Sequence, residues 1–199
     1  MTDGSKVTTL SLQLAVISLP RKILVHTQMK NLLLTLPLLT GSLLANGIDN
    51  LVSYWSFEGD TNDTATAGSS TDNGSWIGTA DYTLSQSGFG QAIETKGNTW
   101  VSVPDSADIR GTSNNISISS WFRVVTFDTN WQALIAKGEN SNWRIARRAG
   151  TNELAYAGGA GDISGGSVNN GSWHHVVGVS EAGVGTRLYI DGVLVEAGS

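Results

Sequence analysis

The chain has 199 residues, of which 40% are hydrophobic and 15% charged, and its formal net charge is −5. This length fits a single domain with appendages, and the hydrophobic content excludes a disordered chain. The negative balance gives no attraction to nucleic-acid phosphates or anionic lipid, so neither partner is expected. The absence of cysteine excludes disulfides and thiolate metal sites. Seven tryptophans, 24 glycines and only 3 prolines suit a β-rich fold with many turns.

Residues 29–47 have the pattern of a signal peptide. A basic Met-Lys-Asn start precedes an apolar run over residues 32–44. The run fits the hydrophobic region of a signal peptide and is shorter than the roughly 20 residues of a membrane helix. Small residues predict cleavage after Gly47, or alternatively after Ala45. A buried core helix is the other interpretation of the run.

A signal peptide at this position implies that Met29 is the start of the translated protein. Residues 1–28 are then an upstream segment that is untranslated or disordered. Residues 48–199 form the mature domain, and we expect it to be secreted or held at the cell surface, with no membrane span after signal cleavage.

The mature region is a series of short segments with the period-two alternation of strands. The clearest is 115–124, where Ile116, Ile118 and Phe122 share one face. Polar or Gly-rich loops are predicted at 58–73 and 158–170. The Asp191-Gly192 pair predicts a type I′ hairpin. The remaining predicted strands are 51–57, 75–77, 92–95, 99–103, 132–137, 142–146, 153–156, 173–179, 187–190 and 193–195. Short strands at this spacing predict an all-β sandwich or barrel.

Five segments resemble, in order, the motifs of the laminin G-like jelly rolls of the concanavalin A-like lectin/glucanase superfamily. They are Leu51–Phe57, Gly90–Ile93, Trp100–Ser106, Ile116–Phe122 and Gly171–Val176. The resemblance covers residues 51–197. It implies a two-sheet antiparallel jelly-roll sandwich that serves as a non-catalytic recognition module, for carbohydrate binding or adhesion, with a glycan or a cell-surface protein as partner.

Two departures from the family pattern affect these expectations. Thr95, Lys96 and Thr99 stand where the family carries the acidic residues on which its calcium sites depend. Family members also continue beyond the 187–195 hairpin, so we expect the last strands of the jelly roll to be missing here. A missing strand would leave an unpaired sheet edge prone to aggregation.

The loop after the first strand carries Asp60, Asp63 and Asp72 beside two asparagines. Oxygen-rich loops can coordinate Ca²⁺, which makes these three residues the candidate metal ligands. The alternative is that they stabilise turns through side-chain to backbone hydrogen bonds. His174 and His175 are adjacent on a strand and therefore point to opposite faces, so they do not form a metal pair.

Three tryptophans near polar loops are candidate carbohydrate contacts, because an exposed indole can stack on a sugar ring. They are Trp76, Trp131 and Trp143, with Arg144 as a neighbouring hydrogen-bond donor. Structural packing is the alternative for each. Trp55, Trp100 and Trp173 lie in apolar strand patterns and are predicted to be buried.

No catalytic residues are predicted. The paired carboxylates of glycosidases on this sandwich, and the Arg-rich and Gln-x-His strands of its lyases, do not occur in the chain. We therefore expect a binding module rather than an enzyme. The alternatives are a structural or protein-interaction domain of a larger extracellular protein, and a remnant of a polysaccharide hydrolase or lyase.

Overall fold

The computed structural model describes residues 13–17, 50–110, 115–138, 142–158 and 161–199. The predicted signal peptide lies outside these residues. The described part of the chain consists of strands and loops without helices, and hence offers no apolar helix of membrane-spanning length.

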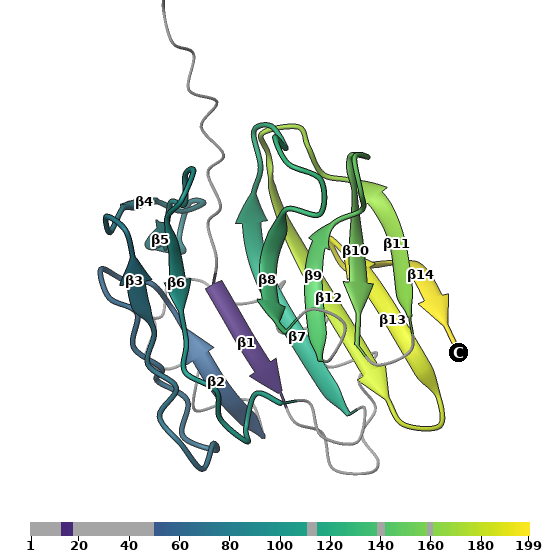
Figure 1. Ribbon diagram of the computed structural model, residues 1–199, viewed down its shortest axis with the longest axis horizontal. Helices are drawn as coiled ribbons and strands as arrows, with labels where there is room; N and C mark the ends of the chain where they lie inside the picture. The colour runs from purple at the N-terminus through teal and green to yellow at the C-terminus, as the bar shows by residue number, and fades with distance from the viewer. Residues whose placement is uncertain (1–12, 18–49, 111–114, 139–141, 159–160) are drawn as a thin grey trace, which may run out of the picture.

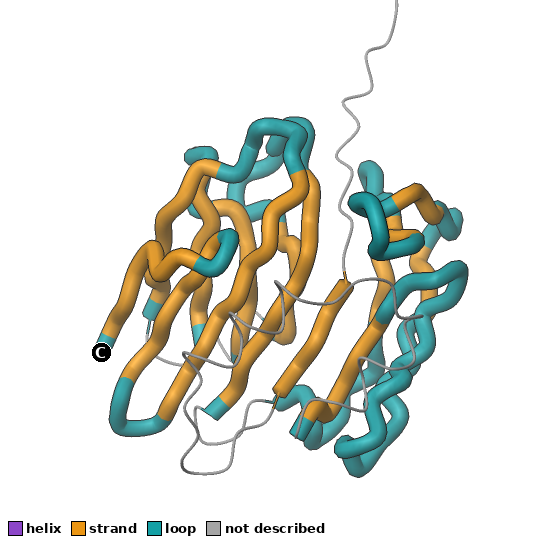
Figure 2. Tube along the Cα trace, turned by 180° about the vertical axis from the view of Figure 1, so that it is seen from behind, coloured by secondary structure: helices purple, strands orange, loops and turns teal. Residues whose placement is uncertain are grey.

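Two antiparallel sheets face each other in separate layers (Figure 1). The larger has the strand order β14-β13-β12-β7-β1-β2, and Figure 2 shows it from behind. Its strands are β14 (Val193–Gly198), β13 (Gly185–Ile190), β12 (Trp173–Glu181), β7 (Ile116–Arg123), β1 (Gln13–Ile17) and β2 (Leu51–Trp55). The smaller contains β11 (Asp162–Ser167), β10 (Glu153–Ala157), β9 (Trp143–Arg147) and β8 (Ala133–Lys137). The predicted all-β, two-sheet antiparallel sandwich is therefore confirmed.

Two short strand pairs lie beside these sheets at the end where β2 is found (Figure 1). One pairs β3 (Ser75–Ile77) with β6 (Trp100–Ser102), and the other pairs β4 (Tyr82–Leu84) with β5 (Gln91–Ile93). In this position β6 and β8 are neighbouring edge strands that belong to two different sheets.

Strand β1 comes from the segment for which the sequence predicted no structure. It lies between β2 and β7, antiparallel to both. Leu14 stands opposite Trp55 on one side and Ser120 on the other. The upstream segment was predicted to be untranslated or disordered, yet these five residues form a strand near one end of the larger sheet.

Strand β11 is a second difference from the sequence prediction. Residues 158–170 were expected to form a loop, because Gly165, Gly166 and several serines carry no apolar alternation. Instead, Asp162–Ser167 pairs with β10 over its length. Backbone pairing with β10, together with Ile163 packed into the core, makes this segment a strand.

The core fills the space between the two sheets. Ile118, Phe122 and Leu188 face it from the larger sheet, and Ile145 and Tyr156 from the smaller, all completely buried. Burying a side chain of this size contributes about 1.5–3 kcal/mol. The Tyr156 ring lies so close to Gly178 that an added Cβ would stand 2.5 Å from it, and this approach requires glycine.

The predicted hairpin between β13 and β14 is confirmed. Asp191 and Gly192 have φ angles of 52° and 78°, as a type I′ turn requires. The Asp191 carboxylate also accepts a hydrogen bond from the His175 backbone N–H at 2.9 Å. The turn is thereby tied to β12, the next strand of the sheet.

Candidate functional site

A groove of about 790 Å³ runs between the facing edges of β6 and β8. On the edges that face away from the groove, β6 pairs with β3 and β8 pairs with β9. The volume falls within the roughly 300–1,000 Å³ that is usual for ligand sites. The groove is therefore the first candidate for a binding site.

Core side chains form the floor of the groove. Trp55, Phe57, Ile93 and Ile109 line it, and each is at most 5% exposed. Trp143 also lines it at 5% exposure, and its indole N–H donates to the Ile109 carbonyl at 2.8 Å. Of the two roles considered for Trp143, the structure assigns packing, which corrects its place among candidate sugar-stacking residues.

The rims of the groove are aromatic on one side and polar on the other. Trp100 on β6 is 50% exposed, whereas the neighbouring Val101 packs against the core. The prediction that Trp100 is buried is therefore wrong, because Val101 occupies the inward face of this strand. Asp128, Thr129 and Gln132 line the groove from the side of β8.

A charged cluster borders the same groove. Asp105 forms ion pairs with Arg110 and Lys137, and both Asp105 and Lys137 line the groove. Hydrogen bonds from Arg110 and then Lys137 hold the pKa of Asp105 well below its usual range. This carboxyl group therefore stays ionised at any physiological pH.

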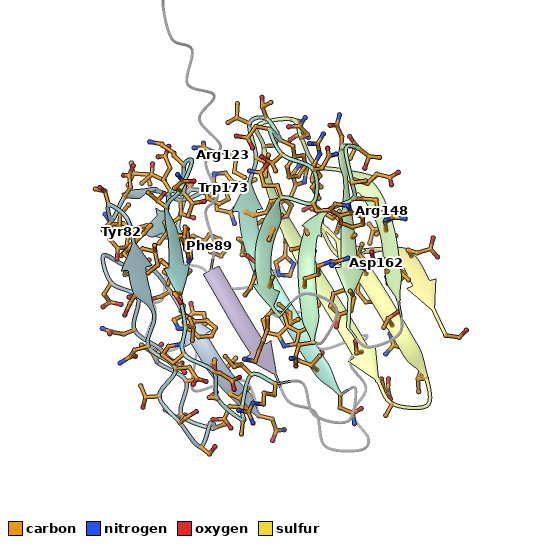
Figure 3. All side chains as sticks on the ribbon, in the orientation of Figure 1. Tyr82, Phe89, Arg123, Arg148, Asp162 and Trp173 are labelled. Carbon is orange, nitrogen blue, oxygen red and sulfur yellow. The ribbon has the colours of Figure 1, made fainter. Side chains whose placement is uncertain are left out.

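A second cluster stands on the outer face of the smaller sheet. The Arg144 and Arg148 guanidinium carbons lie 4.8 and 5.0 Å from the centre of the Trp131 ring. The Asp162 carboxylate accepts hydrogen bonds from Arg144 at 2.9 and 3.0 Å. We call these four residues, Trp131, Arg144, Arg148 and Asp162, the arginine–tryptophan platform; Figure 3 shows Arg148 and Asp162 on the same side of the sheet.

The platform joins two residues that the sequence predicted, Trp131 and Arg144, with two that it missed. Arg148 lies four positions after Arg144 and so shares its face, a signal available from the period-two pattern alone. Asp162 could not be found in this way, because it belongs to β11, where the sequence indicated a loop.

Small side chains beneath the platform leave room for the long ones. Ala146 on β9 is paired with Ala155 on β10, and both are at most 1% exposed. Ala146 alternates with Arg144 along β9 and therefore lies on the same outer face. The arginine stems and the indole can accordingly lie flat over this surface instead of projecting into water.

Trp131 has a strained backbone. Its φ angle is 58°, in the left-handed region that bulky residues rarely adopt. Its N–H donates to the Ala149 carbonyl at 3.1 Å, which holds this conformation, and 38% of the residue remains exposed. Strain of this kind costs about 1–3 kcal/mol and clusters at functional sites.

Trp76 has a different environment from Trp131. It lies on β3 and meets Tyr82 edge-on, with ring centres 5.7 Å apart. Its indole N–H donates to the Tyr82 hydroxyl at 3.0 Å, and the side chain packs against the core. Trp76 is therefore a partly buried packing residue, separate from the platform.

The candidate calcium ligands support the loop itself. Asp63 is buried and accepts hydrogen bonds from the backbone of Tyr54 at 2.8 Å and of Ala65 at 2.9 Å. Asp72 is also buried and accepts from the Ser53 hydroxyl at 2.9 Å. Asp60 is exposed and accepts a hydrogen bond within its own turn, from the Asn62 N–H at 3.0 Å.

These contacts match the alternative of turn stabilisation, since both carboxylate oxygens of Asp63 and of Asp72 accept hydrogen bonds from protein donors. Within the described ranges, no group of three or more acidic or histidine side chains is placed to hold a metal ion.

The two histidines point to opposite faces of β12, as the alternation predicts. The His174 ring lies 5.9 Å from Phe122 and its Nδ1 is 2.7 Å from Asp191. The His175 ring instead stacks near Trp121, and its Nε2 is 2.8 Å from the Ser119 hydroxyl. Burial lowers the pKa of His175 to about 4, so it is neutral in the folded protein at neutral pH.

Comparison with known proteins yields one match. The family described as the concanavalin A-like lectin/glucanases superfamily matches residues 95–199, which is more than half of the chain and includes β6 to β14. No curated protein and no solved structure matches the chain. The matched region contains the β8 rim of the groove and the whole platform.

Proposed function

The chain belongs to the concanavalin A-like lectin/glucanase superfamily, and from this premise we propose that it is a secreted, non-catalytic module that binds carbohydrate. The observation that carries the proposal is the groove in which half-exposed Trp100 stands across from a polar rim. Recognition of a sugar chain requires both features, because pyranoses have apolar ring faces and polar hydroxyl edges.

Different groove residues would contact the apolar face and the hydroxyl groups of a sugar. The Trp100 indole offers a flat apolar surface on which a sugar ring can stack. Asp128, Thr129 and Gln132 provide acceptors and donors for hydroxyl groups. The groove lies between two strand edges rather than in a closed cavity, which favours a segment of an oligosaccharide over a single sugar.

The charge state of the groove supports binding rather than hydrolysis. Glycosidases need one carboxylic acid with a raised pKa and a second carboxylate roughly 5–10 Å away. The acids of the groove are Asp105 and Asp128, and the pKa of Asp105 is lowered by Arg110 and Lys137. A carboxylate held ionised in this way is a poor proton donor. The hydrolase or lyase remnant is therefore the weaker alternative.

The test is oligosaccharide binding by the full chain and by Trp100→Ala, on a glycan array followed by calorimetry. We expect Trp100→Ala to lose at least about tenfold in affinity, since one stacked aromatic contact is removed. Its free energy of unfolding should change by only about 0.5 kcal/mol, because the side chain is half-exposed.

Two variants serve as controls for this measurement, one at the surface and one in the core. Leu84→Ala removes a side chain that is 77% exposed on β4, outside the groove lining, and should leave affinity unchanged. Trp143→Ala removes a buried indole and should cost about 3–5 kcal/mol of stability. Equal affinity of wild type and Trp100→Ala would refute the groove as the binding site. Binding of a cell-surface protein but no glycan would favour the protein-interaction alternative, and release of reducing sugar would favour an enzyme.

A further inference from the structure

Arg148 is a surface cation whose donors are largely unused. Its side chain is 41% exposed, and Nη1 lies 3.8 Å from the Asp162 carboxylate. That distance exceeds the roughly 2.7–3.2 Å of a hydrogen bond. Among the described residues, no hydrogen bond from the Arg148 guanidinium is found. Arg147, its neighbour in sequence, donates instead to the backbone carbonyls of Thr129, Gly150 and Thr151.

The platform holds Arg148 in a defined position. Its guanidinium stacks on the Trp131 ring at 5.0 Å, and Arg144 lies 4.8 Å from the same ring. Asp162 anchors Arg144 through two hydrogen bonds. A guanidinium fixed in one plane loses less freedom when it binds a planar or tetrahedral anion.

The strained backbone of Trp131 is a second, independent observation. A glycine would adopt its φ of 58° without strain, but the position carries the largest side chain instead. The inference from such an outlier is that the side chain is needed there.

The platform is also close to the groove along the chain. Thr129 and Gln132 line the groove, and Trp131 lies between them in sequence. The platform residues do not line the groove, but a sugar chain that extends from the groove over this end of β8 would reach Trp131.

We infer that the arginine–tryptophan platform recognises an acidic sugar residue of the bound glycan. The guanidinium of Arg148 pairs with the carboxylate or sulfate group, and the exposed part of the Trp131 indole contacts the ring. This rests on the proposed function, and it adds the class of glycan: a polysaccharide that carries uronate or sulfate groups. Bidentate pairing is the geometry by which arginine selects both anions.

The test compares a neutral oligosaccharide with a uronate and a sulfated oligosaccharide of the same length, by calorimetry on the full chain. Wild type should bind at least one acidic probe about tenfold more tightly than the neutral one at low ionic strength. The preference should shrink at high ionic strength, because the ion pair is at the surface. The uronate and sulfate arms identify which anion the platform takes.

Arg148→Gln keeps the length of the side chain and removes its charge. We expect it to abolish the preference for acidic probes and to leave neutral binding unchanged. The matched control is Arg187→Gln on β13, which makes the same charge change in an arginine paired with Glu181 and should retain the preference. Trp131→Gly, which suits the positive φ, should weaken acidic binding as Arg148→Gln does.

The possible failures can be told apart. If neutral and acidic probes bind wild type equally, or if Arg148→Gln keeps the preference, this inference is overturned while the groove proposal stands. If none of the probes binds and a neutral glycan array is also blank, both proposals fail together.

Discussion

At the scale of single residues, the burial of His175 makes the stability of the fold depend on pH. It is 5% exposed, and desolvation lowers its pKa from 6.5 to about 4, with Asp191 opposing the shift. The folded protein therefore resists protonating this ring, whereas the unfolded chain takes up the proton below its own pKa. Stability should be flat above about pH 6.5, fall between pH 6.5 and 4, and level off below. The total loss from this residue is about 3 kcal/mol.

Denaturant unfolding across this pH range is the measurement. His175→Gln removes the titrating ring and should remove most of the decline, whereas His174→Gln should keep it. Asp105 has a lowered pKa, so its contribution is lost only as the pH falls below about 3.8, outside this window. An equally steep decline in His175→Gln would contradict the assignment.

At the scale of elements, the Asp191-Gly192 turn decides how β13 meets β14. Gly192 has a φ of 78°, and an added Cβ would meet nothing within 4 Å, so the cost of a substitution is purely conformational. Gly192→Ala should destabilise by about 1–2 kcal/mol, whereas Gly192→Asn should cost less, because asparagine tolerates the left-handed region. Equilibrium unfolding of the two variants checks this; equal losses would mean that the turn is not limited by φ.

Strand β1 is joined to its neighbour β2 by an unusually long connection. Antiparallel neighbours are usually joined by hairpin loops of roughly 2–5 residues, but residues 18–50 lie between β1 and β2. Signal cleavage after Gly47 would remove β1 and leave the facing edges of β2 and β7 without their shared partner. Two exposed edges favour pairing with another strand.

At the scale of the whole molecule, the export prediction can be tested together with β1. Expressed from Met29, the protein should leave the cytoplasm and begin at Ile48, as read by N-terminal sequencing. Arginine substitutions at Leu36 and Leu38 should retain it in the cell, because they interrupt the apolar run. Residues 29–47 retained in the exported protein would contradict cleavage. Peptides from residues 1–28 in the protein made from its complete coding sequence would contradict Met29 as the start and would favour a chain in which β1 stays in the sheet.

Local pattern was sufficient for much of the fold. Alternation at 115–124 and 173–179 predicted β7 and β12, and Asp191-Gly192 predicted the hairpin, because side-chain period and turn preference are properties of neighbouring residues. The ordered motifs identified the superfamily for the same reason.

Only the tertiary structure decided which aromatic side chains are exposed. Trp100 and Trp143 both lie in short strands, yet one is half-exposed and the other forms the floor of the groove. Alternation separates the two faces of a strand but does not say which face another layer covers. The platform depends on the same kind of information. Trp131 and Asp162 are 31 positions apart, and both contact Arg144 only because β8 to β11 form one sheet. Strand order, and with it the site, arises from contacts between distant segments.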